Sequence, residues 1–129
     1  MQEIFDKYVE NSFDGHFQAE FKFHQFKLNY NKYFKNGINQ KVLDIGIGRG
    51  EMLSCMKNWS NNYHGIDISR STVEFCKKLE LSCELVEDTE LWLGGKKNKF
   101  DVITCLDVVE HIPKERLIPF LEAIRNSLS

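Results

Sequence analysis

The chain has 129 residues, which is enough for one hydrophobic core and too few for two independent ones. Hydrophobic residues make up 42% of it and charged residues 28%, so the composition is that of a globular domain and excludes a disordered chain. Its 17 basic and 19 acidic residues give a net charge of −2. This charge argues against nucleic acid as a partner, because electrostatic binding to the phosphate backbone needs an excess of cationic residues.

The sequence has no apolar run long enough to cross a bilayer, and no basic segment followed by an apolar one at its N-terminus. Its four cysteines stand among apolar residues and none forms a C-x-x-C pair: Cys55, Cys76, Cys83 and Cys105. We therefore expect reduced, buried thiols rather than disulfides or a zinc site. Together these features predict a cytoplasmic protein without a membrane partner.

The N-terminal part is rich in aromatic residues, with seven of the ten phenylalanines in residues 1–34. A first stripe repeats in steps of three and four, the spacing of one helix face: Phe13, Phe17, Phe21, His24 and Leu28. A second stripe runs beside it: Phe23, Phe26, Tyr30 and Tyr33. Asn36-Gly37 is a typical helix end. We therefore predict a helical segment over residues 1–36 and a second unit over 37–129.

The pattern changes after residue 40. Four short apolar runs predict buried β-strands at residues 41–45, 63–66, 83–86 and 100–106. Helices are predicted at 51–59, 71–79 and 117–128. Ser71 and Glu74 have the spacing of a capping box that opens the second of these helices, and Pro119 is expected in the first turn of the third.

Strands that alternate with helices predict parallel pairing, because neighbouring parallel strands need a crossover connection. Nearly continuous apolar strands fit a sheet that is covered on both faces. The predicted fold class is therefore α/β, a Rossmann-like open parallel sheet with helices on both faces. Its ligand site is expected at the carboxyl ends of the strands.

Three glycines on alternate positions follow the first strand in Val42-Leu43-Asp44-Ile45-Gly46-Ile47-Gly48-Arg49-Gly50. Glycines let the chain turn sharply and let a ligand approach the backbone. The spacing differs from the G-x-G-x-x-G of dinucleotide sites, and a carboxylate at Asp44 is poorly placed beside a pyrophosphate. The loop instead favours a ligand with an ammonium group, bound near Asp44, Gly46, Gly48 and Gly50.

Two further acidic positions follow the second and third predicted strands. Asp67 ends the second strand, where an acid in nucleotide sites accepts hydrogen bonds from ribose hydroxyls. Ile68 could cover one face of an adenine ring, and Asp88-Thr89 could accept from its amino group. Because parallel strands end at one edge of the sheet, these residues should meet in one crevice.

Four motifs in this order resemble the class I S-adenosylmethionine-dependent methyltransferases over roughly residues 40–128. They are V-L-D-I-G-x-G-x-G from Val42, H-G-I-D-I-S from His64, E-D-T from Glu87, and F-D-V-I-T-C-L-D-V-V-E-H-I-P from Phe100. The resemblance implies that the glycines wrap the methionine part of the cofactor beside Asp44. It also implies Asp67 on the ribose, Asp88 on the adenine, and the backbone around Leu106 at the methionine amino group.

The resemblance implies transfer of the sulfonium methyl group to an acceptor, which leaves S-adenosylhomocysteine. The expected acceptor is a hydroxyl of a small molecule, with a sugar as one option. His111 is a candidate general base, because imidazole takes up a proton near neutral pH, but it could equally only order its loop. Asp107, Glu110 and His111 also resemble a metal-binding motif of small-RNA 2′-O-methyltransferases; we predict no metal, because a further histidine ligand is not evident.

The aromatic N-terminal helix has two interpretations. It either packs on the edge of the sheet or, as in relatives, closes over cofactor and acceptor as a lid. In the second case the candidates for substrate contact are Tyr8, His16, His24, Tyr30 and Tyr33.

The predicted strands are fewer than the seven of the family's fold, so the sheet is expected to be cut short after the fourth strand. An alternative function is therefore a non-catalytic module that binds S-adenosylmethionine. A nicotinamide-dependent oxidoreductase is a third hypothesis, which the glycine spacing and Asp44 argue against. A fourth strand at an apolar edge predicts a homodimer, another partner, or cover from the N-terminal helix.

Overall fold

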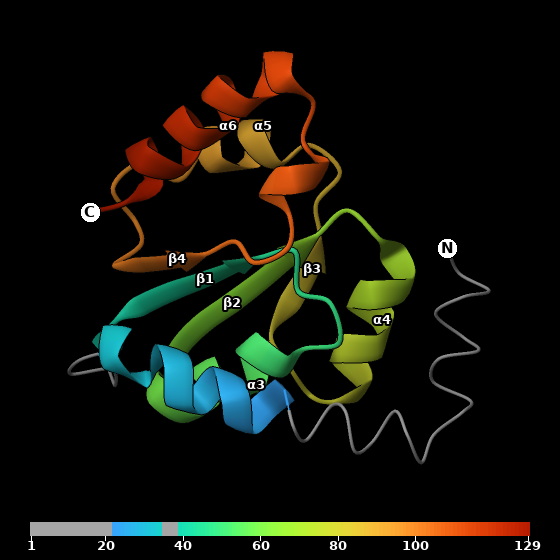
Figure 1. The fold of residues 1–129 in the computed structure, drawn as a ribbon, viewed down its shortest axis with the longest axis vertical. Helices are drawn as coiled ribbons and strands as arrows, with labels where there is room; N and C mark the ends of the chain where they lie inside the picture. The colour runs from blue at the N-terminus through green and yellow to red at the C-terminus, as the bar shows by residue number, and fades with distance from the viewer. Residues whose placement is uncertain (1–21, 35–38) are drawn as a thin grey trace.

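The computed structural model describes residues 22–34 and 39–129 of the chain. Four parallel strands form a single sheet in the order β3-β2-β1-β4 (Figure 1). The strands are β1 (Lys41–Ile45), β2 (Asn62–Asp67), β3 (Cys83–Leu85) and β4 (Val102–Thr104). The first stripe's Phe13, Phe17 and Phe21, and the predicted helix end at Asn36-Gly37, lie outside the described residues.

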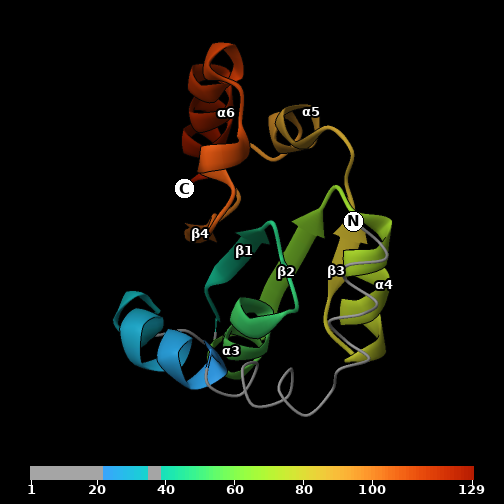
Figure 2. The ribbon, with the colours of Figure 1, turned by 45° about the vertical axis from the view of Figure 1, so that its right-hand side comes forward.

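Helices cover both faces of the sheet, which confirms the predicted fold class (Figures 1 and 2). One face carries a helix over residues 22–30, α3 (Glu51–Trp59) and α4 (Arg70–Lys78). The other carries α5 (Thr89–Gly94) and α6 (Lys114–Ser127). Two short 3-10 turns complete the described elements: η1 (Asn31–Tyr33) and η3 (Val109–His111).

Strand β1 is the centre of the sheet. It pairs with β2 along its whole length, and with β4 from Val42 to Asp44. All of its residues after Lys41 are buried. Successive side chains of a strand point to opposite faces, so Val42 enters one core cluster while Leu43 and Ile45 enter the other. This two-sided burial explains why β1 has apolar residues on both faces, with Asp44 as its one buried acid.

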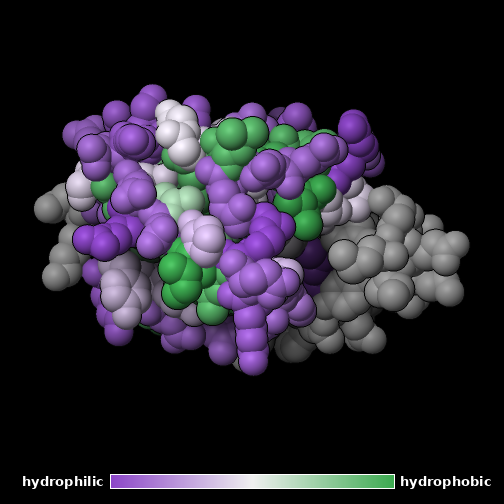
Figure 3. All heavy atoms as spheres, turned by 90° about the horizontal axis from the view of Figure 1, so that it is seen from above, coloured by the Kyte–Doolittle hydropathy of each residue, from purple (hydrophilic) through white to green (hydrophobic). Residues whose placement is uncertain are grey.

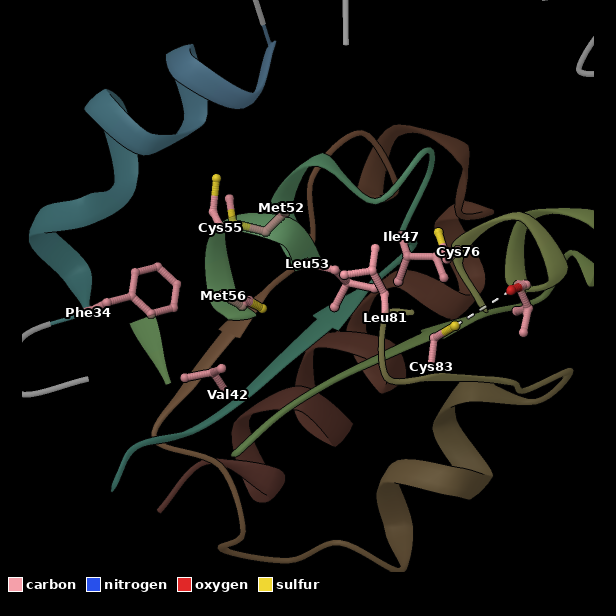
Figure 4. Close-up of a cluster of buried hydrophobic side chains, with 11 residues drawn as sticks. Phe34, Val42, Ile47, Met52, Leu53, Cys55, Met56, Cys76, Leu81 and Cys83 are labelled. Carbon is pink, nitrogen blue, oxygen red and sulfur yellow. Dashed lines mark hydrogen bonds between the residues drawn. The ribbon is translucent and has the colours of Figure 1, made fainter. Parts of the chain in front are cut away.

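Each face of the sheet has its own hydrophobic cluster. The cluster under α3 and α4 is drawn in Figure 4, where side chains of the two helices lie against those of the sheet and the glycine loop. The second cluster lies under α5 and α6 and contains Leu43, Ile45, Ile66, Val86, Leu93 and Phe120. On the surface above α5 and α6, apolar side chains are exposed in patches among hydrophilic ones (Figure 3).

The four cysteines are free thiols, as predicted. Cys55, Cys76 and Cys83 are buried and Cys105 is half-buried. Burial raises the pKa of Cys55 and of Cys105 to about 11 and that of Cys76 to about 12. The Cys83 thiol donates to the Val73 carbonyl oxygen at 3.6 Å (Figure 4). These thiols are therefore protonated at neutral pH, and their role is to pack in the protein interior.

Within the described part of the N-terminal helix, the second aromatic stripe is the one that packs against the core. Leu28 of the first stripe is 83% exposed, whereas Phe23, Phe26 and Tyr30 of the second pack against the core. The helix meets the domain along one side, so one stripe faces α3 and the other faces away. The helix over 22–30 passes into η1 and then to buried Phe34, whose ring lies 4.4 Å from that of Trp59.

The start of α4 also differs from the prediction. Its N-cap is Ser69, whose hydroxyl oxygen accepts from the backbone N–H of Thr72 at 3.4 Å, and Ser71 lies inside the helix. The chain turns into α4 directly after β2, so the residue with extended backbone at this turn is Ser69. A capping box pattern alone does not reveal where the chain leaves the sheet.

Two corrections concern the C-terminal half. Helix α6 begins at Lys114, so Pro119 lies in its interior and not in its first turn. The ring removes one N–H that would otherwise bond to the carbonyl of Glu115. Helix α5 was not predicted, because six residues are too few to show a helical period. Strand β4 is shorter than the predicted 100–106.

Strand β4 lies at the edge of the described sheet, as predicted. The chain returns to this edge after α6, where Phe100 forms a parallel bridge with Leu128. The N–H of Phe100 donates to the Ser127 carbonyl at 2.9 Å, and the N–H of Ser129 to the Phe100 carbonyl at 2.8 Å. Pairing of this edge with a second copy stays a prediction. Among the described helices, none has both the length and the apolar character of a membrane span.

Gly65 of β2 provides a test of the packing around β1. A Cβ at this position would lie 2.6 Å from both Ile47 Cγ2 and Leu53 Cδ1. We expect Gly65→Ala to lower the free energy of unfolding by about 1–3 kcal/mol through overpacking. The matched control is Gly94→Ala, whose Cβ would meet nothing within 4 Å, and which should be neutral or stabilising by up to about 1 kcal/mol. Equal effects of both changes in urea unfolding would contradict this packing.

Candidate functional site

A cavity of about 630 Å³ opens at the carboxyl ends of β1, β2 and β4. The loop of residues 46–50, which joins β1 to α3, lines it with residues 46–49. The segment after β4 and the beginning of α6 form one side, and the helix over 22–30 contributes from another. The cavity therefore lies where the open parallel sheet predicts a ligand site.

The glycine loop depends on backbone conformations that other residues rarely adopt. Gly46 has a φ of +78°, and a Cβ there would lie 2.3 Å from Val108 Cγ2. Gly50 has a φ of +81°, and its Cβ would lie 2.6 Å from Leu81 Cδ1. Gly46 therefore lets the segment after β4 approach the loop, and Gly50 lets the loop pack on the connection between α4 and β3. Of these two glycines, Gly46 lines the cavity and Gly50 does not.

The Asp67 carboxylate holds the glycine loop against the end of β2. Its Oδ2 accepts from the backbone N–H of Ile47 at 3.0 Å, and its Oδ1 from that of Ser69 at 2.8 Å. Each carboxylate oxygen has two acceptor positions, so both oxygens can still accept from a ligand. Asp67 is thus a fixed acceptor at the cavity wall.

Asp44 is a buried acid in the middle of the sheet. It lines the cavity, yet it is only 2% exposed. The Thr104 hydroxyl, from the neighbouring strand β4, donates to its Oδ1 at 2.6 Å. The pKa of this carboxyl group is raised to about 8, mainly because the group is buried. The Thr104 hydrogen bond lowers the pKa, whereas the charges of Asp67 and Glu51 raise it further.

The segment after β4 brings its own groups to the cavity. Leu106, Asp107, Val108 and His111 all line it. Asp107 has a φ of +57°, a left-handed conformation that aspartate tolerates better than most residues. The His111 side chain is 78% exposed, and its Nε2 lies 3.7 Å from Glu110 Oε1. His111 can therefore exchange a proton with a molecule that enters from solvent.

The structure does not gather the residues of the alternative metal site. In the described part of the chain, no group of three or more His, Cys, Asp or Glu side chains is arranged to hold a metal ion. Asp107, Glu110 and His111 thus lie near one another in sequence without forming such a group.

Most of the predicted site residues come together. The cavity is lined by Asp44, Gly46, Gly48, Asp67, Ile68, Thr89, Leu106 and His111. Gly50 and Asp88 are not among the lining residues. Asp88 is the N-cap of α5, where its Oδ1 accepts from the backbone N–H of Leu91 at 3.1 Å. Its predicted contact with a base stays a prediction.

Several lining residues were missed by sequence reasoning. Glu51 directly follows the glycine loop, and this position could have been noticed. Lys22 and Phe26 reach the cavity from the helix over 22–30, while Arg116 reaches it from α6 and pairs with Glu90 of α5 at 2.8 Å. Residues this far in sequence from the motifs have no neighbouring pattern that would indicate a place in the site. Of the proposed lid residues, His24, Tyr30 and Tyr33 do not line the cavity.

Asp44 makes stability depend on pH. Its pKa is about 8 in the folded chain against 3.8 for an unperturbed aspartate, so between these values the folded state keeps a proton that the unfolded state loses. Stability from this group is therefore complete below about pH 4 and is lost as the pH rises toward 8. We expect the free energy of unfolding of Asp44→Asn, taken relative to that of the native chain, to increase by roughly 2 kcal/mol or more as the pH rises from 4.5 to 8.

Urea unfolding at a series of pH values measures this difference. A matched control is Asp101→Asn, since Asp101 is an exposed acid whose pKa is lowered by its hydrogen bonds with the Lys41 backbone and Ser129. This variant should lose stability relative to the native chain above about pH 4. Parallel pH profiles for the native chain and Asp44→Asn would show that Asp44 does not keep its proton.

Comparisons with known proteins agree with this geometry. A family described as a methyltransferase domain matches residues 42–129. The ubiquinone biosynthesis O-methyltransferase of Pasteurella multocida is 30% identical over 84% of this chain, which corresponds to 52% of that protein. The protein of the same name from Actinobacillus pleuropneumoniae is 28% identical over 78% of this chain and 47% of its own length. The chain thus spans about half the length of the curated relatives it matches.

A solved structure shows the same fold. The S-adenosylmethionine-dependent methyltransferase from Archaeoglobus fulgidus is 28% identical, with a TM-score of 0.76, and the match covers 86% of this chain and 48% of that one. The family match extends from β1 through α6 and includes most of the cavity-lining residues. The chain therefore belongs to this methyltransferase domain family, which confirms its resemblance to the class I S-adenosylmethionine-dependent methyltransferases.

Proposed function

We propose that the cavity binds S-adenosylmethionine and that the protein transfers its methyl group to a hydroxyl of a small molecule, releasing S-adenosylhomocysteine. One observation carries the proposal. Asp67, at the end of β2, is fixed by the Ile47 and Ser69 backbone and still has free acceptor positions at the cavity wall. A carboxylate at this place in an open α/β sheet is suited to a pair of ribose hydroxyls.

The nucleoside end of the cofactor would lie beyond Asp67. Ile68 is 69% exposed although its side chain is apolar, and it lines the cavity. It offers an apolar contact for one face of an adenine ring. Thr89 lines the same region at the start of α5. Asp88, next to it, is proposed for the adenine amino group through the carboxyl oxygen that does not cap the helix.

The amino-acid end would lie over the glycine loop. Asp44, Gly46, Gly48 and Leu106 line the cavity, and we assign them to this part of the ligand. Asp44 complements an ammonium group. Lys22 lines the cavity from the helix over 22–30, and its ammonium group complements a carboxylate.

Methyl transfer itself needs little from the protein beyond placement. An acceptor oxygen attacks the methyl carbon in line with the bond to sulfur, the carbon–sulfur bond breaks, and sulfur keeps the electron pair as a neutral thioether. The hydroxyl proton must leave, and His111 is proposed to take it. Hydroxyl acceptors are supported by the relatives that are named O-methyltransferases. A sugar acceptor, a homodimer and a cytoplasmic location stay predictions.

Cofactor binding can be tested by calorimetric titration with S-adenosylhomocysteine. We expect Asp67→Ala to weaken binding roughly 10- to 100-fold, since hydrogen bonds to a charged group contribute about 1.5–3 kcal/mol. The matched control is Glu74→Ala on α4, an exposed acid outside the cavity, which should bind like the native chain. NADH should not bind. Binding of NADH, or equal affinity of Asp67→Ala and Glu74→Ala, would refute the assignment.

The role of His111 can be tested with methyl-labelled S-adenosylmethionine and a panel of phenols and sugars. We expect His111→Ala to slow transfer roughly 100-fold or more without changing the affinity for S-adenosylhomocysteine. The matched control is His24→Ala, a histidine that is exposed but does not line the cavity. Transfer at the native rate by His111→Ala would exclude a general base at this position. Tight cofactor binding with no transfer to any acceptor would favour a non-catalytic binding module.

A further inference from the structure

Asp44 of β1 and Thr104 of the edge strand β4 form a hydrogen-bonded pair across two neighbouring strands. Asp44 stands in register with Thr104 of β4 on one side and with Gly65 of β2 on the other, where no side chain is present. Among the described residues, Thr104 is the side chain that donates a hydrogen bond to the carboxyl group, at 2.6 Å. The carboxyl group is almost completely buried, and it lines the cavity.

The groups that face Asp44 do not favour a negative charge. Asp67 at the end of β2 and Glu51 at the start of α3 are both acids whose charges oppose its ionisation. Cys76 of α4 and Cys105 after β4 are the thiols that interact with it, and burial keeps both of them protonated. Burial and the two neighbouring acids therefore disfavour an anion at Asp44, and the Thr104 hydroxyl is the group that opposes them.

The cations of the cavity do not compensate for these acids. Arg49 lies 3.8 Å from Glu51, and Arg116 pairs with Glu90 at 2.8 Å. Lys22 and His111 also line the cavity, and neither forms an ion pair with Asp44. An ionised Asp44 would thus be a buried charge without a partner cation among the described residues, which is a costly state.

We propose that Asp44 and Thr104 make cofactor binding release a proton: Asp44 is a neutral acid in the empty cavity and becomes a carboxylate when the ammonium group of the cofactor is seated against it. The inference rests on the proposed function and goes beyond it. The balance is simple, because the carboxyl O–H bond breaks, the proton goes to the buffer, and the electron pair stays on the carboxylate. The ligand keeps its own ammonium protons.

Thr104 is the positioning residue of this pair. Its hydroxyl donates to the carboxyl oxygen, and a donor of this kind stabilises the ionised form. Without this donor the carboxyl group would hold its proton more strongly. In the empty cavity, a Thr104→Val variant should therefore keep its proton to a higher pH and bind the ligand more weakly below that pH, whereas Thr104→Ser keeps the hydroxyl and should behave like the native chain.

Proton release has a direct consequence for affinity. At a pH below the folded-state pKa of Asp44, affinity for a ligand with an ammonium group should rise about tenfold per pH unit. It should become constant once the group is ionised in the empty cavity as well. A nucleoside without the amino-acid part does not supply the cation, so its affinity should not follow this profile.

The experiment is calorimetric titration of the full chain with S-adenosylhomocysteine at pH 7 in phosphate and in Tris, two buffers with different heats of ionisation. The difference in heat counts the protons that are exchanged. We expect release of close to one proton per ligand for the native chain, Thr104→Ser and Thr104→Val, because the carboxyl group is protonated in the empty cavity of all three at pH 7, and none for Asp44→Asn. Binding of 5′-methylthioadenosine, which has the nucleoside and sulfur without the amino-acid part, should release none.

Affinity measured at pH 6, 7 and 8 completes the test. The binding deficit of Thr104→Val relative to the native chain should be largest at pH 6 and smallest at pH 8, while a purely structural defect would weaken binding equally at all three values. Binding of S-adenosylhomocysteine without proton release would overturn this inference and leave the proposed function standing. Failure of S-adenosylhomocysteine to bind at any of these pH values would overturn the proposed function and this inference with it.

Discussion

The cavity depends on the way that one carboxylate joins two segments of backbone. Asp67 accepts the Ile47 N–H with one oxygen and the Ser69 N–H with the other, so the glycine loop, the end of β2 and the start of α4 share one anchor. Hydrogen bonds to a charged acceptor are stronger than neutral ones. The loop therefore has a defined shape before any ligand arrives, which lowers the entropic cost of binding.

The electrostatic character of the cavity follows from the same topology. Parallel strands deliver Asp44 and Asp67 to one edge of the sheet, and α3 begins there with Glu51. The charges of Asp67 and Glu51 favour a positively charged ligand and disfavour a phosphate, and an ionised Asp44 adds to them. The cations at the cavity, such as Arg116, are partly engaged by acids of their own. The topology of the sheet therefore favours positively charged ligands at this cavity.

Local patterns predicted the fold well, and tertiary placement explains what they missed. Strand β1 was predicted because burial on both faces requires neighbouring apolar residues, and the glycine loop because positive φ angles require closely spaced glycines. The choice between Ser69 and Ser71 as N-cap depended on where the chain leaves the sheet, which no short pattern records. Lys22 lines the cavity through packing between distant segments, so its position in the sequence carries no sign of it.

The contact between Gly46 and Val108 joins two loops that both line the cavity. Val108 occupies the space that a side chain at residue 46 would need, so the glycine loop and the segment that carries His111 lie in direct contact. In a close-packed interior such contacts transmit displacement instead of absorbing it. A ligand that spreads the glycine loop therefore also shifts the segment after β4, which makes the two loops one mechanical unit during filling and emptying of the cavity.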